Sequence, residues 1–318
     1  MSDPVYHRWL HRYAVLTATM ALLLPILVGA IVTTRGAGMA FPDWPSSDGQ
    51  NMFLYPWLAS AGDKFLEHGH RLAGSFVGVL SIGLAFFCWK TDERRWIKGL
   101  GGVILLAVII QGYLGGKRVL NNDPGIALIH GVFASWVFAL MSVIALVTSR
   151  TWFDIPAVQD PQALKVCRYS SLITVLLVAT QYFLGAFLRH KGTAVYEHIG
   201  FAFIVVLAAM WLFVSAANTR IPWLVRPAFL FVAAVMFQLL VGAATYVVKF
   251  GFENFVPQQE SLLQVSVRTG HVLMGMLVWM LAVIYAVRVQ RLISARTANS
   301  SSAPDLTKLT PSVTGGAS

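Results

Sequence analysis

The sequence has little charge and very little cysteine. Only 12% of its 318 residues are charged and 57% are hydrophobic, whereas about a quarter of the residues in soluble domains are charged. This composition excludes a water-soluble enzyme, and the high apolar content excludes a disordered chain. Its two cysteines, Cys88 and Cys167, cannot build a disulfide scaffold or a tetrahedral cysteine-rich zinc site.

Clustered basic charge is also missing. Lys and Arg outnumber Asp and Glu by 24 to 14, which gives a net charge of +10. These basic residues are spread between long apolar runs and do not gather on one polar domain. They therefore indicate the flanks of membrane spans, not a nucleic-acid-binding surface. We expect membrane lipid as a partner and no nucleic acid.

Long apolar runs are what the sequence has in abundance. A bilayer core of roughly 30 Å needs about 20 apolar residues per helix. Runs of that kind lie at about 13–33, 68–88, 99–116, 126–148, 169–188, 197–217, 226–248 and 269–289. The sequence therefore predicts an all-α integral membrane protein with eight transmembrane helices. The first run lacks a clear small-residue cleavage site, which favours a membrane helix over a signal peptide.

The basic residues also predict an orientation. An even number of spans places both termini on one side, and most Lys and Arg residues flank the span ends on that side. By the positive-inside rule, both termini are predicted to be cytoplasmic. The long connections at about 34–67 and 249–268 are then external. The Ser- and Thr-rich segment 296–318 is predicted to be a disordered tail.

A short pattern recurs near the outer ends of three spans. It reads Gln111-Gly-Tyr-Leu-Gly115, Gln181-Tyr-Phe-Leu-Gly185 and Gln238-Leu-Leu-Val-Gly242, and the first span keeps only Leu27-Val-Gly29. Each is followed by an external loop and then by a helix with a histidine near its outer end: His70, His130, His198 and His271. We interpret the chain as two pseudo-repeated four-helix bundles, residues 1–150 and 165–290, with two such histidines each.

Two histidines on facing helices of a bundle can bind one haem iron, because neutral imidazole is a good iron ligand. A histidine near a helix end can instead be an interfacial polar residue, but four in register with a repeated motif favour ligands. Haem also carries two propionates that need cationic partners. Residues at external helix ends that could serve are Arg35, Arg71, Lys117, Arg118, Arg189, Lys191 and Arg268. Arg71 is the favoured one, although each could instead extend to lipid headgroups.

One acidic residue distinguishes the first bundle from the second. Glu67 stands three residues before His70 and shares a helix face with it, whereas Glu197 is adjacent to His198 and turned by about 100°. A carboxylate at a haem edge can relay protons or stabilise developing positive charge. We therefore predict a reactive haem site in the first half and a resident, electron-handling haem in the second. Glu67 could instead pair with Arg71, four residues on.

The first external loop and the helix that follows it resemble those of a known family. The stretch from Gly29 to Pro45, GAIVTTRGAGMAFPDWP, followed by Glu67-x-x-His70-Arg71, is similar to the first hairpin of the haem A synthase family of bacteria and mitochondria. The repeats and later histidines extend the likeness over about residues 13–290. The resemblance implies an eight-helix enzyme of the bacterial plasma (inner) membrane. Such an enzyme oxidises the C8 methyl of haem O to a formyl group, through hydroxymethyl haem I, for assembly of aa3-type cytochrome oxidase.

The resemblance also implies roles for the residues. Haem O would be the substrate of the N-terminal half, residues 1–150, at His70 and His130 with Glu67 as the catalytic carboxylate. A haem b cofactor would lie in the C-terminal half, residues 165–290, between His198 and His271. A haem O synthase would supply the substrate; the motifs specify no electron donor and are compatible with a homo-oligomer.

The sequence departs from the family in its external loops. Many bacterial members have cysteine pairs there, but this chain has Phe41 before Pro42 and a Ser46-Ser47 pair after Pro45. We therefore predict no loop disulfide, as in the cysteine-free branch of the family. His190 is interpreted as a loop or propionate-contact residue.

Two other functions stay open on the residues alone. A di-haem b-type electron-transfer protein would share every histidine but would give Glu67 no chemical task. A transporter whose repeats gate a substrate would bind no haem.

Overall fold

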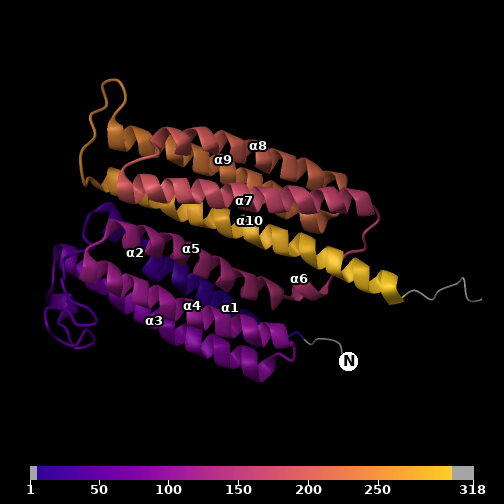
Figure 1. The fold of residues 1–318 in the computed structure, drawn as a ribbon, viewed down its shortest axis with the longest axis horizontal. Helices are drawn as coiled ribbons and strands as arrows, with labels where there is room; N and C mark the ends of the chain where they lie inside the picture. The colour runs from indigo at the N-terminus through magenta and orange to yellow at the C-terminus, as the bar shows by residue number, and fades with distance from the viewer. Residues whose placement is uncertain (1–5, 303–318) are drawn as a thin grey trace, which may run out of the picture.

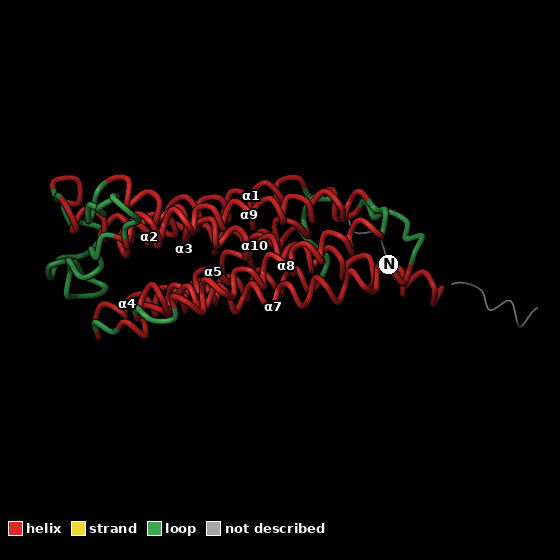
Figure 2. The backbone as a smooth tube through the Cα atoms, turned by 90° about the horizontal axis from the view of Figure 1, so that it is seen from above, coloured by secondary structure: helices red, strands yellow, loops and turns green. Residues whose placement is uncertain are grey.

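The computed structural model describes residues 6–302 and contains no strand among them. Within this part of the chain, eight helices are long and apolar enough to cross a membrane. They are Arg8–Thr34, Gly62–Thr91, Arg95–Asn121, Pro124–Val147, Pro161–Lys191, Val195–Asn218, Pro222–Phe250 and Leu262–Thr297. The prediction of an all-α integral membrane protein with eight spans is confirmed, and Figure 2 shows helices throughout, with loops at the two ends of the bundle.

The first span is irregular in its middle. It consists of α1 (Arg8–Ala21), a π-helical turn η1 (Leu22–Ile26) and α2 (Leu27–Thr34). Pro25 lies inside η1, and a proline within a helix has no N–H to donate and clashes with the preceding turn. A π-turn at this position lets the helix continue past the proline.

The remaining elements follow in chain order. They are η2 (Trp57–Ala59), α3 (Gly62–Thr91), α4 (Arg95–Asn121), α5 (Pro124–Val147), α6 (Arg150–Phe153), α7 (Pro161–Lys191), α8 (Val195–Asn218), α9 (Pro222–Phe250) and α10 (Leu262–Ser302). Three of these helices begin with proline, a residue whose missing N–H is harmless at a helix start. The carboxylates of Asp123 and Asp160 cap α5 and α7 by accepting hydrogen bonds from first-turn N–H groups.

The helices run side by side in two groups (Figure 1). One group contains α1 to α5 and the other contains α7 to α10; α10 packs against α2 and α5, and α5 packs against α7. The loops at 35–61 and 251–261 lie at one end of the bundle, which we call the outer end. The start of α1 and the end of α10 lie at the opposite end. This placement agrees with an even number of crossings, whereas the cytoplasmic position of the termini stays a prediction.

The buried apolar residues form two clusters, one in each helix group. The first cluster includes Leu84, Ile104 and Met141, and the second includes Leu212 and Phe231. In the second group the cluster lies away from the outer end. The buried residues of α7 stop at Val178, those of α8 begin at Val205, and those of α9 stop at Val235 except for Val248. The outer parts of α7 to α9 therefore contain few buried residues, whereas Gln264 and Thr269 on α10 are buried there.

Helix α10 continues through Ser302, and no glycine or proline interrupts the chain between Arg296 and Pro304. Its last residues, 296–302, overlap the segment 296–318 that the sequence predicts as a disordered tail, and that tail stays a prediction. The rest of the predicted tail, residues 303–318, lies outside the described residues.

Candidate functional site

The four histidines of the repeated hairpins meet in two pairs. The ring centroids of His70 on α3 and His130 on α5 are 6.3 Å apart, with an angle of 83° between the ring planes. Those of His198 on α8 and His271 on α10 are 6.2 Å apart at 88°. The two pairs thus have nearly the same geometry although they come from different halves of the chain.

This geometry suits a metal ion that brings further ligands of its own. Rings with centroids 6.2 and 6.3 Å apart are close enough for both imidazoles of a pair to bind one metal ion. Among the described residues, no group of three or more His, Cys, Asp or Glu side chains could hold a metal ion by itself. Each histidine pair would therefore suit a metal that is already held in a larger group, such as an iron porphyrin.

A glycine makes room for each histidine ring. A Cβ atom added to Gly29 would lie 2.6 Å from Cε1 of the His70 ring. The corresponding distances are 3.0 Å for Gly115 to His130, 2.9 Å for Gly185 to His198 and 3.0 Å for Gly242 to His271. The last position of the repeated pattern is therefore glycine because the ring of the next histidine occupies the space of a side chain.

Three of these histidines each accept, at the backbone carbonyl, a hydrogen bond from the glutamine of their own hairpin. The side-chain Nε2 of Gln111 donates to the carbonyl of His130 at 3.1 Å. Gln181 donates to the carbonyl of His198 at 2.9 Å, and Gln238 donates to that of His271 at 3.1 Å. The pattern is visible in the sequence, but this function of its glutamine was not predicted. The signal was the four-residue spacing of glutamine and glycine, which places both on one helix face.

The first hairpin lacks this anchor. Four residues before Gly29 stands Pro25, at the position where the other hairpins have glutamine. The His70 ring lies next to the backbone carbonyl of Pro25. Its Nδ1 is buried and has no hydrogen-bond partner among the described residues. Among the described residues, the His70 backbone therefore lacks the glutamine contact that the other three histidines have.

Glu67 is buried, and both of its oxygens are engaged. The side chain of Arg71 donates to Oε1 at 2.7 Å, and the backbone N–H groups of Ala40 and Phe41 donate to Oε2 at 2.7 and 3.3 Å. The ion pair that sequence analysis considered as an alternative role for Glu67 is therefore present. Glu197 in the second half is exposed. Among the described residues, only the first histidine pair therefore has a buried carboxylate within one helical turn of a histidine.

The guanidinium of Arg71 donates hydrogen bonds to the outer loop. Its Nη1 donates to the carbonyls of Asp43 and Ser46 at 2.9 and 2.7 Å, while Nη2 donates to Glu67. The guanidinium also stacks over the ring of Phe41 at 5.1 Å. In this arrangement Arg71 holds the loop in place and has no free Nη group directed at a ligand.

Two further residues stabilise the same loop. His68 is fully buried, its Nδ1 lies 3.1 Å from Oγ of Ser47, and its ring contacts that of Tyr55 at 4.8 Å. Burial alone would raise the pKa of the Asp43 carboxyl. Hydrogen bonds from Ser46 and from the backbone of Gly49 and Asp48 outweigh that effect and lower the pKa. The loop thus has a defined structure without any cysteine, and both cysteines of the chain are unpaired and buried in helices.

Replacing Arg71 by methionine should release this loop. The substitution leaves Glu67 as a buried carboxylate without its charge partner. Such a change lowers the free energy of unfolding by about 3–5 kcal/mol. We expect rapid cleavage within residues 36–61 under limited proteolysis and a lower unfolding temperature. Lys64→Met is the matched control, because it removes an exposed ion pair with Asp48 from the same loop. Equal resistance of both variants to proteolysis would contradict this account of the loop.

The two halves are connected at the outer end by α7. Nη2 of Arg189 donates to the carbonyl of Ala30 at 2.8 Å and to Oγ1 of Thr34 at 3.2 Å, both on α2. The next residue, His190, points its Nε2 toward Gly131 on α5. His190 therefore lies beside the first histidine pair although it belongs to the second half.

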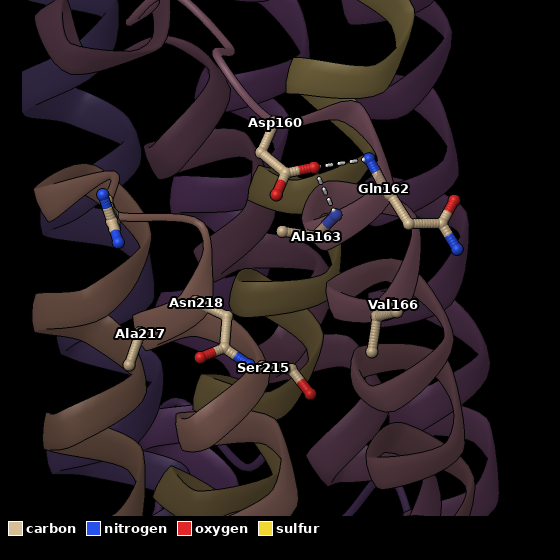
Figure 3. Close-up of a pocket in the computed structure, with 8 residues that line it drawn as sticks. Asp160, Gln162, Ala163, Val166, Ser215, Ala217 and Asn218 are labelled. Atoms are coloured by element: carbon tan, nitrogen blue, oxygen red, sulfur yellow. Dashed lines mark hydrogen bonds between the residues drawn. The ribbon is translucent and has the colours of Figure 1, made fainter.

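One surface depression lies far from the histidines. It has a volume of about 410 Å³ and is lined by Asp160, Gln162, Ala163 and Val166 at the start of α7 and by Ser215, Ala217, Asn218 and Arg220 at the end of α8. Figure 3 shows that the carboxylate of Asp160 is occupied there by the N–H groups of Gln162 and Ala163. Gln181 lies about 20 residues further along α7, which is about 30 Å, so the depression has no part in the histidine sites.

Eight apolar spans and two facing histidine pairs among the described residues define the class: an integral membrane protein with two sites at which a pair of imidazoles could hold a metal-containing group. A family model described as "Cytochrome oxidase assembly protein" matches residues 11–198. This is more than half of the chain, and the chain belongs to that family. The match includes the first histidine pair and reaches His198.

Curated relatives agree with this assignment. The chain is 27% identical over 191 residues to a protein named "Heme A synthase" from Alkalihalophilus pseudofirmus, a match covering 58% of this chain and 61% of that protein. A protein of the same name from Symbiobacterium thermophilum is 29% identical over 192 residues, covering 58% of this chain and 60% of that protein. The matched region thus spans about three fifths of these relatives.

A further similarity is to a differently named protein. The chain is 28% identical over 130 residues to a "Protoheme IX farnesyltransferase" from Halobacterium salinarum. This match covers 39% of the chain and only 27% of that protein.

Proposed function

We propose that the chain is a haem A synthase, which oxidises the C8 methyl of haem O to a formyl group for assembly of aa3-type cytochrome oxidase. The observation that carries the proposal is a pair of matched histidine sites, of which only the first, among the described residues, has a buried carboxylate, Glu67, within one helical turn of a histidine. The family and the relatives named "Heme A synthase" support the same activity.

The two sites would bind different haems. His70 and His130 would hold haem O as substrate in the N-terminal half, and His198 and His271 would hold a resident haem b in the C-terminal half. The residues of the second site fit such a group, because their rings are close enough for both to bind one metal ion and the outer parts of α7 to α9 contain few buried residues. When bound, haem b would supply one-electron redox chemistry.

The side chains of the first site would position the substrate and its charges. Gln111 and Gly115 orient His130, and Glu67 provides a carboxylate three residues before His70. As the catalytic residue, Glu67 would stabilise positive charge that develops at the reacting methyl or accept a proton at Oε2, where the loop N–H contacts would have to open. Arg71 would contribute to cofactor binding indirectly, by holding Glu67 and the loop.

We also propose a membrane location, a source of substrate and a source of electrons. The protein would lie in the bacterial plasma membrane with both termini in the cytoplasm. A haem O synthase would supply the substrate, and the similarity to part of a protein named for protohaem farnesylation supports that connection. A separate electron donor would serve the resident haem.

Expression in a bacterium that makes haem O but no haem A tests the function. Extracted haems, separated by chromatography, should include haem A when the chain is produced and lack it in the vector control. A di-haem electron-transfer protein would leave only haem O and haem b, with a b-type band in the purified protein. A transporter would show no bound haem, so each alternative has its own result.

The glycine positions offer a prediction for the resident haem. Gly185→Leu should displace the His198 ring, because even a Cβ atom would lie 2.9 Å from Cε1. We expect the purified variant to lose most of its b-type absorbance in a reduced-minus-oxidised spectrum. Gly200→Leu is the control on α8, since a Cβ there meets nothing within 4 Å. Full absorbance in Gly185→Leu would show that the ring position is not needed.

A further inference from the structure

The outer end of the first half contains an unpartnered arginine on the histidine-facing side of α4. Arg118 follows Gly115 by three residues and Gln111 by seven, so it shares the helix face that contacts His130. Among the described residues no side chain or carbonyl forms a hydrogen bond or ion pair with its guanidinium. Gly38 of the outer loop lies so close to this guanidinium that a Cβ atom there would overlap it.

The charges around Arg118 leave it without a counter-ion. The carboxylate of Glu67 is near enough to act on it, but both Glu67 oxygens are bonded to Arg71 and to the loop backbone. From the other half, Arg189 and His190 on α7 are near enough for their charges to act on that of Arg118. Arg268 and Lys249 are likewise within electrostatic range of Arg189. A partly buried group of cations of this kind is unfavourable unless an anion joins it.

We propose that Arg118 binds a carboxylate of the tetrapyrrole held by His70 and His130. This inference rests on the proposed function and names the residue that recognises a propionate of the substrate. A planar guanidinium can donate two parallel hydrogen bonds to a carboxylate. Arg118 lies three residues, or about 4.5 Å along the axis of α4, beyond the glycine that contacts His130. Its long side chain can therefore reach the edge of a porphyrin centred between the rings.

Two neighbouring cations do not fit this role. The Nη groups of Arg71 donate to loop carbonyls and to Glu67. Lys117 is adjacent in sequence and so is turned by about 100° around the helix from Arg118. Lys117 is therefore the matched control for a substitution of Arg118.

A binding titration separates a carboxylate contact from a structural effect. The full chain, purified with its resident haem, is titrated with iron protoporphyrin IX and, separately, with its dimethyl ester, and binding is followed by Soret absorbance. Wild type should bind the free acid more tightly than the ester. Arg118→Gln should weaken binding of the free acid by about 10-fold or more and leave the ester unchanged. Arg118→Lys should restore part of the difference, and Lys117→Gln should behave as wild type.

Several results would overturn the inference. Equal affinity of wild type for acid and ester would exclude a carboxylate contact without any variant, even if Arg118→Gln failed to fold. Equal weakening of both ligands by Arg118→Gln would make Arg118 a structural residue. Failure of the proposed function looks different: wild type would bind haem and distinguish acid from ester but would not convert haem O.

Discussion

Alanine in place of His271 is expected to leave the purified protein without the haem b that we propose for its C-terminal half. The ring of His271 is one of two that stand 6.2 Å apart. If both rings hold the haem iron, removing one of them would leave the iron with a single protein ligand. The reduced-minus-oxidised spectrum should lose its b-type band, and His198→Ala should have the same effect. Extracted haem per protein, measured by chromatography, gives the size of the loss.

His11 supplies the control for this experiment. It lies at the opposite end of the bundle, where its Nδ1 contacts the carbonyl of Ala145 at 3.0 Å. His11→Ala should keep the full haem content. The histidine assignment would be wrong if His271→Ala also kept it, or if every histidine variant lost haem to the same extent.

Glu67→Gln is expected to keep the resident haem b and to abolish haem A formation. The amide nearly matches the carboxylate in size and can still accept a hydrogen bond from the loop, but it has no negative charge and is a far weaker base. Loss of a general base or of fixed charge typically lowers a rate by about 100-fold or more. Haem O and haem A are measured by chromatography after single-variant expression, and Glu197→Gln serves as the exposed counterpart.

Glu67→Gln and Glu67→Ala are expected to affect the outer loop differently. Because Glu67 also anchors Ala40, Phe41 and Arg71, Glu67→Ala would remove the charge and release the loop together. Limited proteolysis separates the two effects: the glutamine variant should keep the loop protected, whereas the alanine variant should not. A fully active Glu67→Gln enzyme would reduce Glu67 to a loop anchor.

The spans and the pairing of histidines could be predicted from sequence for simple physical reasons. Each span is a long apolar run, and each hairpin returns the chain to the same membrane depth, so His70 and His130 or His198 and His271 arrive at similar heights. The contacts that hold these rings could not be predicted. Gln111 donates to the carbonyl of His130, and the His130 ring lies where a side chain at position 115 would be. Both contacts depend on the relative rotation of two helices about their axes. Hydropathy does not encode that rotation.

The outer loop was beyond sequence reasoning for a related reason. Arg71 is adjacent to His70, and this made it the favoured propionate partner, but its donors are taken by Asp43 and Ser46, more than 20 residues away in sequence. The same long-range closure leaves Arg118, seven residues after Gln111, without a hydrogen-bond or ion-pair partner among the described residues. Local spacing identified both arginines and could not rank them.

The most direct measurement of the central claim follows haem O in the purified protein. The protein, loaded with haem O and supplied with reductant and oxygen, is sampled over time, and its haems are extracted and separated. The account predicts that haem O declines, that haem A appears through a hydroxymethyl intermediate, and that haem b stays constant. Unchanged haem O beside a haem b that is still reduced and reoxidised would contradict it and would show an electron-transfer protein.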